Sequence, residues 1–194
     1  MRLPTIFFRP YDFLVTLSVS IAMCGRRTAF YAWLETPIGV VYVASSNKGV
    51  VLLSLGVDEE HFKEKLLGMG FRPTRGGLVE GVVRQLCEYF KGERASFDVP
   101  LDVRGTPFQL AVWRAVETIP YGETRSYKWV AERVGRPRAV RAVGRALAAN
   151  PVPIIIPCHR VVRSDGGLGG FSLGLEVKEF LLELEAKNKC RFKA

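Results

Sequence analysis

The pattern of apolar and polar positions differs between the two halves of the chain. In the first half, short runs of β-branched and aromatic residues are separated by Pro, Gly and Asn-x-Gly turns, which is typical of antiparallel strands. These runs lie at residues 30–35, 40–44 and 50–55. A helical pattern covers residues 60–67. A second helix is predicted over 78–91, where apolar residues recur every four positions: Leu78, Val82, Leu86 and Phe90.

Residues 95–103 have the pattern of one more strand. Residues 28–103 therefore predict an α+β domain with an antiparallel sheet. No group of residues in this half indicates chemistry, and we interpret it as a supporting domain. Together with a helical second half, it makes the chain an α/β protein of two domains.

The second half, residues 104–194, is predicted to be mostly helical. Thr106 followed by Pro107 is a strong helix start. Helical patterns also cover residues 126–134 and 137–149, with a glycine-containing turn between them. Two short helices joined in this way predict a helix-turn-helix.

The segment 137–149 has two distinct sides on a helical wheel. At about 100° per residue, one side is apolar and consists of Val140, Val143 and Leu147. The other side carries arginines next to small residues: Arg138, Arg141 and Arg145 with Gly144, Ala148 and Ala149. Small residues between arginines allow a helix to lie close to a groove of nucleic acid.

Charge supports that interpretation. Between Tyr121 and Arg163 there are nine Lys or Arg and two Glu, so this segment carries +7 of the chain's net +9. A surface of this kind favours a nucleic-acid partner. The alternative is a basic face that is only solvated.

The segment 150–160 is the strongest candidate for chemistry. Three prolines and three isoleucines precede Cys158, which is followed by His159 and Arg160. The thiolate is the reactive form of cysteine, and a cationic or basic neighbour lowers the pKa of a thiol from about 8.5. Cys158 is thus either an activated nucleophile or, like most free cysteines, a packed core residue.

Two features downstream bear on this choice. The glycine-rich residues 164–170 match no nucleotide-binding pattern and are better suited to form a wall that a ligand approaches closely. In the last predicted helix, 173–187, Lys178 and Glu185 are seven positions apart and share a face. They are either a surface pair or the side chains that hold the glycine loop and orient the imidazole.

Other classes of protein fit the composition poorly. Four scattered cysteines without a CxxC pair, together with two histidines, argue against a zinc site and a secreted disulfide scaffold, and we expect no metal and no cofactor. The apolar run 13–23 resembles a signal peptide but is too short to span a bilayer. We therefore treat residues 1–27 as an extension, with Met23 as an alternative start, and leave open a disulfide of Cys24. We expect a cytoplasmic monomer with no membrane partner.

The chain from Thr106 onward resembles the O6-alkylguanine–DNA alkyltransferases. The resemblance rests on Asn-Pro-Val-Pro-Ile-Ile-Ile-Pro-Cys-His-Arg-Val-Val at 150–162, Gly-Leu-Gly-Gly-Phe-Ser at 167–172, and Tyr-Gly-Glu-Thr-Arg-Ser-Tyr at 121–127. The Pro-Cys-His-Arg-Val motif is highly specific in this setting. The first half matches in outline, as the RNase H-like domain of the family, and the second half as its winged-helix-like domain.

The resemblance implies repair of duplex DNA in one irreversible step, without a cofactor. Cys158 would accept the alkyl group from O6 of a flipped guanine, with O4-alkylthymine as a further candidate substrate. His159 would act as a base through a water, with Glu185 holding the imidazole. Tyr127 would protonate or hydrogen-bond the leaving purine, and Asn150 would brace the turn before the thiol.

The resemblance also assigns binding residues. Arg141 would fill the gap left by the extruded nucleotide, and the surrounding helix, with Arg138, Arg145, Ala142 and Gly144, would contact DNA. The substrate pocket would be formed by Pro153, Leu168, Gly169, Phe171, Ser172, Leu173 and Lys178.

Two residues depart from some relatives. Phe171 replaces a tyrosine, and Leu173 replaces a glycine, from which we expect a tighter pocket that accepts benzyl groups poorly. Two other functions stay open at this point. They are a DNA-binding module without catalysis and a cysteine hydrolase that uses Cys158 and His159.

Overall fold

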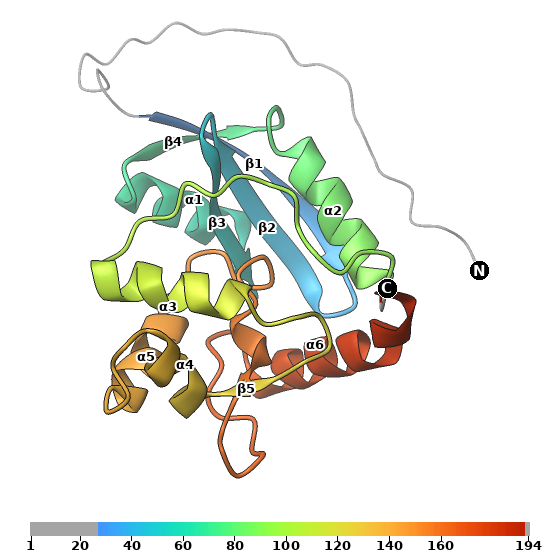
Figure 1. The fold of residues 1–194 in the computed structure, drawn as a ribbon. Helices are drawn as coiled ribbons and strands as arrows, with labels where there is room; N and C mark the ends of the chain where they lie inside the picture. The colour runs from blue at the N-terminus through green and yellow to red at the C-terminus, as the bar shows by residue number, and fades with distance from the viewer. Residues whose placement is uncertain (1–26, 193–194) are drawn as a thin grey trace, which may run out of the picture.

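The computed structural model describes residues 27–192, and Figure 1 shows a sheet domain packed above a helical domain. The apolar run 13–23 and Cys24 lie outside the described residues. The sheet has the order β3-β2-β1-β4, with β1 (Arg27–Thr36), β2 (Gly39–Ser46), β3 (Gly49–Leu55) and β4 (Phe71–Arg75).

The prediction of a purely antiparallel sheet was wrong at one edge. β1 pairs antiparallel with β2, and β2 with β3, but β4 pairs parallel with β1. The long connection that a parallel pair requires runs from β1 through β2, β3 and helix α1 (Glu59–Gly68) to β4. The sequence of β4 hid the strand because Phe71 is its one fully buried side chain and Pro73 lies in its middle.

Helix α2 (Glu80–Phe90) is shorter than predicted. Leu78, expected in its core stripe, precedes the helix and is 61% exposed, so that assignment was wrong; Val79 is buried in its place. Two glycines with positive φ, Gly76 and Gly77, form the turn before it and delay the helix start.

The predicted strand at 95–103 is absent from the described chain. Its backbone touches the sheet at one isolated bridge between Val50 and Leu101. Val50 N–H donates to Pro100 O at 2.8 Å, and Asp102 N–H donates to Val50 O at 2.9 Å. Pro100 has no N–H of its own, which limits a longer ladder.

The helical domain consists of α3 (Pro107–Glu117), α4 (Tyr127–Arg133), α5 (Val140–Ala148) and α6 (Leu175–Asn188). A capping box between Thr106 and Gln109 starts α3, and the Ser126 hydroxyl accepts from Trp129 N–H at the start of α4, both as the sequence indicates.

Two predicted helix starts lay too early. Pro137 and Arg138 form a turn before α5, in which Ala139 N–H donates to Arg136 O at 2.8 Å. Val140 is therefore the first residue of α5 and is 37% exposed, whereas Ala146 joins the buried side of α5. Gly174, with φ of 101°, excludes residue 173 from α6.

A short parallel ladder was not predicted. β5 (Arg125–Ser126) pairs with β6 (Val161–Val162), so the start of α4 lies beside the segment that carries Cys158. The Cys158–Arg160 segment itself is a single 3-10 turn, η2. A second one, η3 (Lys189–Phe192), follows α6.

One apolar core runs through both domains. It joins Leu34, Val43 and Leu53 of the sheet to α2 and to residues of the helical domain such as Val116 and Leu147. A second cluster, in which Tyr31, Phe62 and Phe71 take part, lies between the sheet and α1. The segment with Cys158 therefore packs against a large shared interior.

Candidate active site

Asn150 organises the loop that leads to the thiol. Its Oδ1 accepts from Val152 N–H at 3.0 Å, and its Nδ2 donates to Ile156 O at 3.0 Å. The same Nδ2 lies 3.1 Å from Cys158 Sγ. The amide thus closes the loop and holds the sulfur.

The loop is also held by its own backbone and by the sheet domain. Ile154 has φ of 74°, a left-handed conformation that non-glycine residues rarely adopt. Leu53 N–H of β3 donates to Pro151 O at 2.8 Å, which ties the loop to the edge of the sheet.

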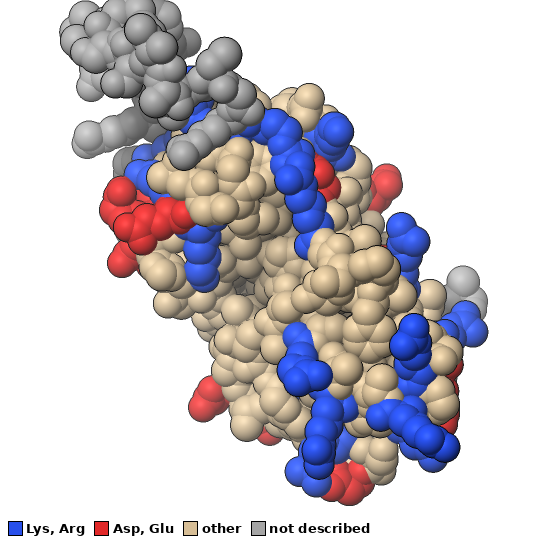
Figure 2. All heavy atoms as spheres, turned by 90° about the vertical axis from the view of Figure 1, so that its left-hand side faces the viewer, with Lys and Arg blue, Asp and Glu red and all other residues tan. Residues whose placement is uncertain are grey.

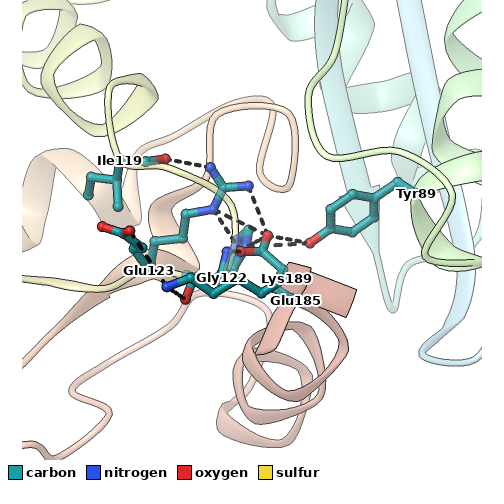
Figure 3. A network of polar contacts seen from close by, with 8 residues as sticks. Tyr89, Ile119, Gly122, Glu123, Glu185 and Lys189 are labelled. Atoms are coloured by element: carbon teal, nitrogen blue, oxygen red, sulfur yellow. Dashed lines mark hydrogen bonds and ion pairs between the residues drawn. The ribbon is translucent and has the colours of Figure 1, made fainter. Parts of the chain in front are cut away.

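The carboxylate of Glu185 is the centre of a buried hydrogen-bond cluster (Figure 3). His159 Nε2 and Tyr89 Oη both lie 2.8 Å from its Oε1. Arg160 binds both oxygens, with Nε at 2.9 Å from Oε2 and a terminal nitrogen at 2.9 Å from Oε1. Gly122 N–H donates to Oε2 at 2.9 Å. Burial raises the pKa of this carboxyl, but the hydrogen bonds from His159 and Arg160 outweigh it and lower the pKa to about 2.

This cluster fixes the tautomer of His159. Because ionised Glu185 can only accept, His159 Nε2 must carry the proton and Nδ1 must have the free lone pair. Nδ1 is buried and has no hydrogen-bond partner within residues 27–192. Burial lowers the pKa of His159 even though Glu185 raises it, so the neutral imidazole can accept a proton at Nδ1.

The sequence leaves open whether the pKa of Cys158 is lowered. Burial raises it to about 11, although the hydrogen bond from Asn150 and the charge of Lys178 lower it. Neither neighbouring side chain in the motif supplies a free positive charge that would offset the burial. His159 is uncharged, and the guanidinium of Arg160 is paired with Glu185. The resting group is therefore a thiol that needs a base.

Lys178 holds the glycine loop. Its Nζ donates to Val161 O at 2.6 Å and also to Leu168 O, and the side chain is fully buried. Burial lowers the pKa of Lys178 to about 8. Lys178 and Glu185 share a face of α6, and both are buried, so they are not a surface pair.

A cavity of about 1130 Å³ lies between α5, the start of α4 and the glycine loop, and Cys158 is among its lining residues. Tyr127 lies on its wall, and the Tyr127 hydroxyl donates to Gly170 O at 3.2 Å. Gly169 has φ of 70°, and a Cβ there would lie 2.8 Å from the Tyr127 ring.

Most of the predicted pocket and DNA-binding residues border this cavity. These are Tyr127, Arg141, Gly144, Arg145, Leu168, Gly169, Phe171 and Ser172. Five others do not line it: Arg138, Ala142, Pro153, Leu173 and Lys178. Because Leu173 does not line the cavity, the structure does not support the narrower pocket that we expected from this residue.

Basic side chains surround this face of the helical domain, as Figure 2 shows. Arg138, Arg141 and Arg145 are all exposed, and none forms an ion pair within the described part of the chain. Arg160, counted with the basic surface from the sequence, is instead buried at 6% exposure. Arg163, which received no role, lines the cavity.

Tyr89 is the site residue that the sequence did not reveal. It lies 96 positions before Glu185 and on the other domain, and no motif links the two. Among the described residues there is no group of three or more His, Cys, Asp or Glu side chains that could hold a metal ion. Nor is any helix in 27–192 long and apolar enough to cross a membrane.

Fold and site together define a class of protein with a buried Cys-His-Glu arrangement at the floor of a cavity beside a basic helix pair. Two family models match the chain. They are the 6-O-methylguanine DNA methyltransferase ribonuclease-like domain over residues 29–103 and the DNA binding domain of the same family over residues 107–187.

Similar proteins agree with these models. A methylated-DNA–protein-cysteine methyltransferase of Methanosarcina barkeri is 45% identical over 82% of this chain and 98% of its own length. The constitutive enzyme of that name from Bacillus subtilis is 43% identical over 80% of this chain and 94% of its own. The crystal structure of Mycobacterium tuberculosis OGT in complex with DNA superposes with a TM-score of 0.73 at 42% identity, covering 82% of this chain and 94% of that one. The chain belongs to the methylated-DNA–protein-cysteine methyltransferase family.

Proposed function

We propose that this chain repairs DNA by moving an alkyl group from O6 of guanine, and from O4 of thymine as a further candidate, to Sγ of Cys158. The observation that carries the proposal is the position of the thiol. Cys158 lines a cavity between a basic helix and a glycine loop, next to an imidazole whose tautomer is fixed by Glu185. Enzymes of this name among the relatives give the substrate class.

The proton of the thiol is the first to move. In the proposed reaction, Nδ1 of His159 takes the proton from Cys158 through a bridging water, and Glu185 stabilises the imidazolium that forms. Asn150 Nδ2 donates to the sulfur and stabilises the negative charge that develops on it.

The sulfur then attacks the alkyl carbon. The new S–C bond forms as the C–O6 bond breaks, and the electron pair of that bond stays on the purine. Tyr127, whose hydroxyl is on the cavity wall, supplies a proton or hydrogen bond to the leaving base. The product thioether has no easy leaving group, so each molecule reacts once.

DNA binding is assigned to the helix pair α4 and α5. Arg141 would occupy the gap left by the flipped base, and Arg138 and Arg145 would contact phosphates. Ala142 and Gly144 allow the helix to lie close to the duplex. Of the predicted pocket residues that do not line the cavity, Lys178 would act through the glycine loop, and Pro153 through the loop before the thiol.

The proposal includes finer features of the fold. The sheet domain would have an RNase H-like arrangement and the helical domain a winged-helix-like one, with boundaries at 28–103 and 104–194 after an extension at 1–27. The family-model matches at 29–103 and 107–187 support this division. We further propose a monomer that acts in the cytoplasm without a cofactor.

Intact-mass measurement tests the proposed function. Incubation with duplex DNA that contains O6-methylguanine should add one methyl group per protein molecule, located on Cys158. The variant Cys158→Ser should bind the same DNA and gain no mass. Binding by the unchanged chain without an adduct would identify a lesion-binding module instead, and repeated turnover of an ester or amide would identify a hydrolase.

A further inference from the structure

The sheet domain contributes one side chain to the cluster around Glu185. Tyr89 lies on the last turn of α2, is fully buried, and points its hydroxyl at Glu185 (Figure 3). Its ring is fixed by three aromatic neighbours, with centroids 5.5 Å from Phe90, 5.4 Å from Phe97 and 6.1 Å from Tyr121. The packing leaves the hydroxyl little freedom to turn away.

We propose that Tyr89 is a positioning residue for the transfer reaction, acting through Glu185 on the base His159. Its hydroxyl lies 2.8 Å from the same Oε1 that is bound by the His159 Nε2–H, and 3.5 Å from Nε2 itself. This inference rests on the proposed function, since it concerns the rate of that reaction.

Two effects follow from the shared oxygen. Glu185 Oε1 accepts from Tyr89, His159 and Arg160, so the three donors together fix its direction and thereby the plane of the imidazole. The Tyr89 hydroxyl also neutralises part of the carboxylate charge that His159 experiences. Without it, the carboxylate would favour the imidazolium more strongly, and the base would be protonated at a higher pH.

The other groups around His159 act in known directions. Glu185 of α6 favours its protonation, whereas Arg160 of the same turn and Lys178 of α6 oppose it. Arg160 also lies over the ring of Tyr121, at 5.7 Å from the centroid, and Cys158 is the adjacent residue in the chain. The substitution Tyr89→Phe leaves all of these in place and removes one hydroxyl.

A matched control exists in the same domain. The Tyr31 hydroxyl donates to Glu59 Oε1 at 2.6 Å, and Tyr31 is buried in the second core cluster, away from the cavity. Tyr31→Phe thus removes a bond of the same chemistry without touching the site. The experiment measures the single-turnover rate of methyl transfer from O6-methylguanine duplex DNA between pH 5 and 9, at saturating DNA, for the unchanged chain and both variants.

Tyr89→Phe should slow transfer by about tenfold to a hundredfold at neutral pH, the range expected for one hydrogen bond to a charged group. The acid limb of its profile should move to higher pH, while DNA affinity and the Tyr31→Phe profile stay unchanged. An unchanged rate and profile for Tyr89→Phe would overturn the inference. So would a slower rate whose acid limb has not moved.

The result also separates this inference from the proposed function. If the unchanged chain forms no adduct, the proposed function fails and the inference falls with it. If the unchanged chain transfers the methyl group and Tyr89→Phe matches it at every pH, the role of Tyr89 alone is refuted.

Discussion

Asn150 Nδ2 donates to Cys158 Sγ across 3.1 Å, and the same nitrogen donates to a carbonyl of the loop between them. One amide therefore holds the sulfur and shapes the segment that carries it. Substitutions at this residue should affect reactivity and stability together.

Asn150→Ala should slow methyl transfer by about tenfold to a hundredfold, because the developing thiolate loses a donor. It should also cost about 2 kcal/mol of unfolding free energy, since Val152 N–H and Ile156 O lose their buried partner. Single-turnover kinetics and denaturant unfolding measure the two effects. Asn188→Ala is the control, because Asn188 Nδ2 donates to Leu184 O, at the end of α6. Equal rates for both variants would contradict the role of Asn150.

The transfer rate should be independent of pH over a broad plateau. The lower end of this plateau should lie below about pH 6.5, because the reaction needs neutral His159 and burial lowers the pKa of this residue. Its upper end should extend towards the pKa of about 11 of Cys158. His61→Gln should give the same profile, since His61 is exposed on α1. A rate that instead rises by about tenfold per pH unit through the neutral range would show direct ionisation of the thiol.

Acid should destabilise the fold in two steps. The pKa of His159 is lower in the folded chain than in the unfolded chain. Its contribution to the free energy of unfolding is therefore present above about pH 6.5 and is lost as the pH falls through its pKa in the folded chain. Glu185 contributes above its unfolded pKa of 4.5 and loses that contribution as pH falls to about 2. Unfolding by urea at a series of pH values checks this. Glu185→Gln should remove the second step, whereas Glu123→Gln, at a half-buried ion pair with Arg125, should keep it.

Gly169→Ala should perturb the cavity wall. A Cβ at this position would meet Tyr127 at 2.8 Å, and the backbone has φ of 70°, so the change adds a clash to backbone strain. Gly166→Ala supplies the control, because Gly166 has φ of 86° with no atom near its Cβ. Each variant should lose about 1 kcal/mol from strain, and Gly169→Ala alone should also slow transfer. Equal transfer rates in the two variants would show that Tyr127 tolerates displacement.

Arg145→Ala should weaken binding to duplex DNA and reduce the slope of log affinity against log salt by about 1. Arg145 is exposed on α5 at the cavity rim, whereas Arg84 is exposed on α2 of the sheet domain. Fluorescence anisotropy at several salt concentrations measures both variants. A similar loss of slope in Arg84→Ala would place DNA on a different face.

The reactive segment was accessible from the sequence because its chemistry is contiguous. Cys158 and His159 are neighbours, and helical spacing places Glu185 on one face with Lys178, although the role of Glu185 came from the family resemblance. The charge state of the site was harder to predict from the sequence. Arg160 looks like part of a basic surface until its ion pair with Glu185 is known. The contact of Tyr89 with Glu185 depends on how the two domains pack against each other, which local sequence patterns do not predict.

The predicted secondary structure was wrong where the local sequence pattern was weak or fitted more than one structure. β4 has one fully buried residue and a proline, so it shows no alternation, and only its pairing with β1 defines it. Residues 95–103 have strand-like composition, but Pro100 limits the ladder. Helix starts were misplaced by two or three residues where glycines or a turn delayed them.

Because a single core joins both domains, the amount of folded, reactive protein depends on packing throughout the chain. Val43 of β2 and Val116 of α3 belong to one buried cluster, although neither touches the cavity. A cell that carries a weakened variant at such a position would hold fewer folded molecules, and each folded molecule removes one lesion in the proposed reaction. Repair capacity would then fall in proportion to the folded population, while the chemistry of every surviving molecule stayed intact.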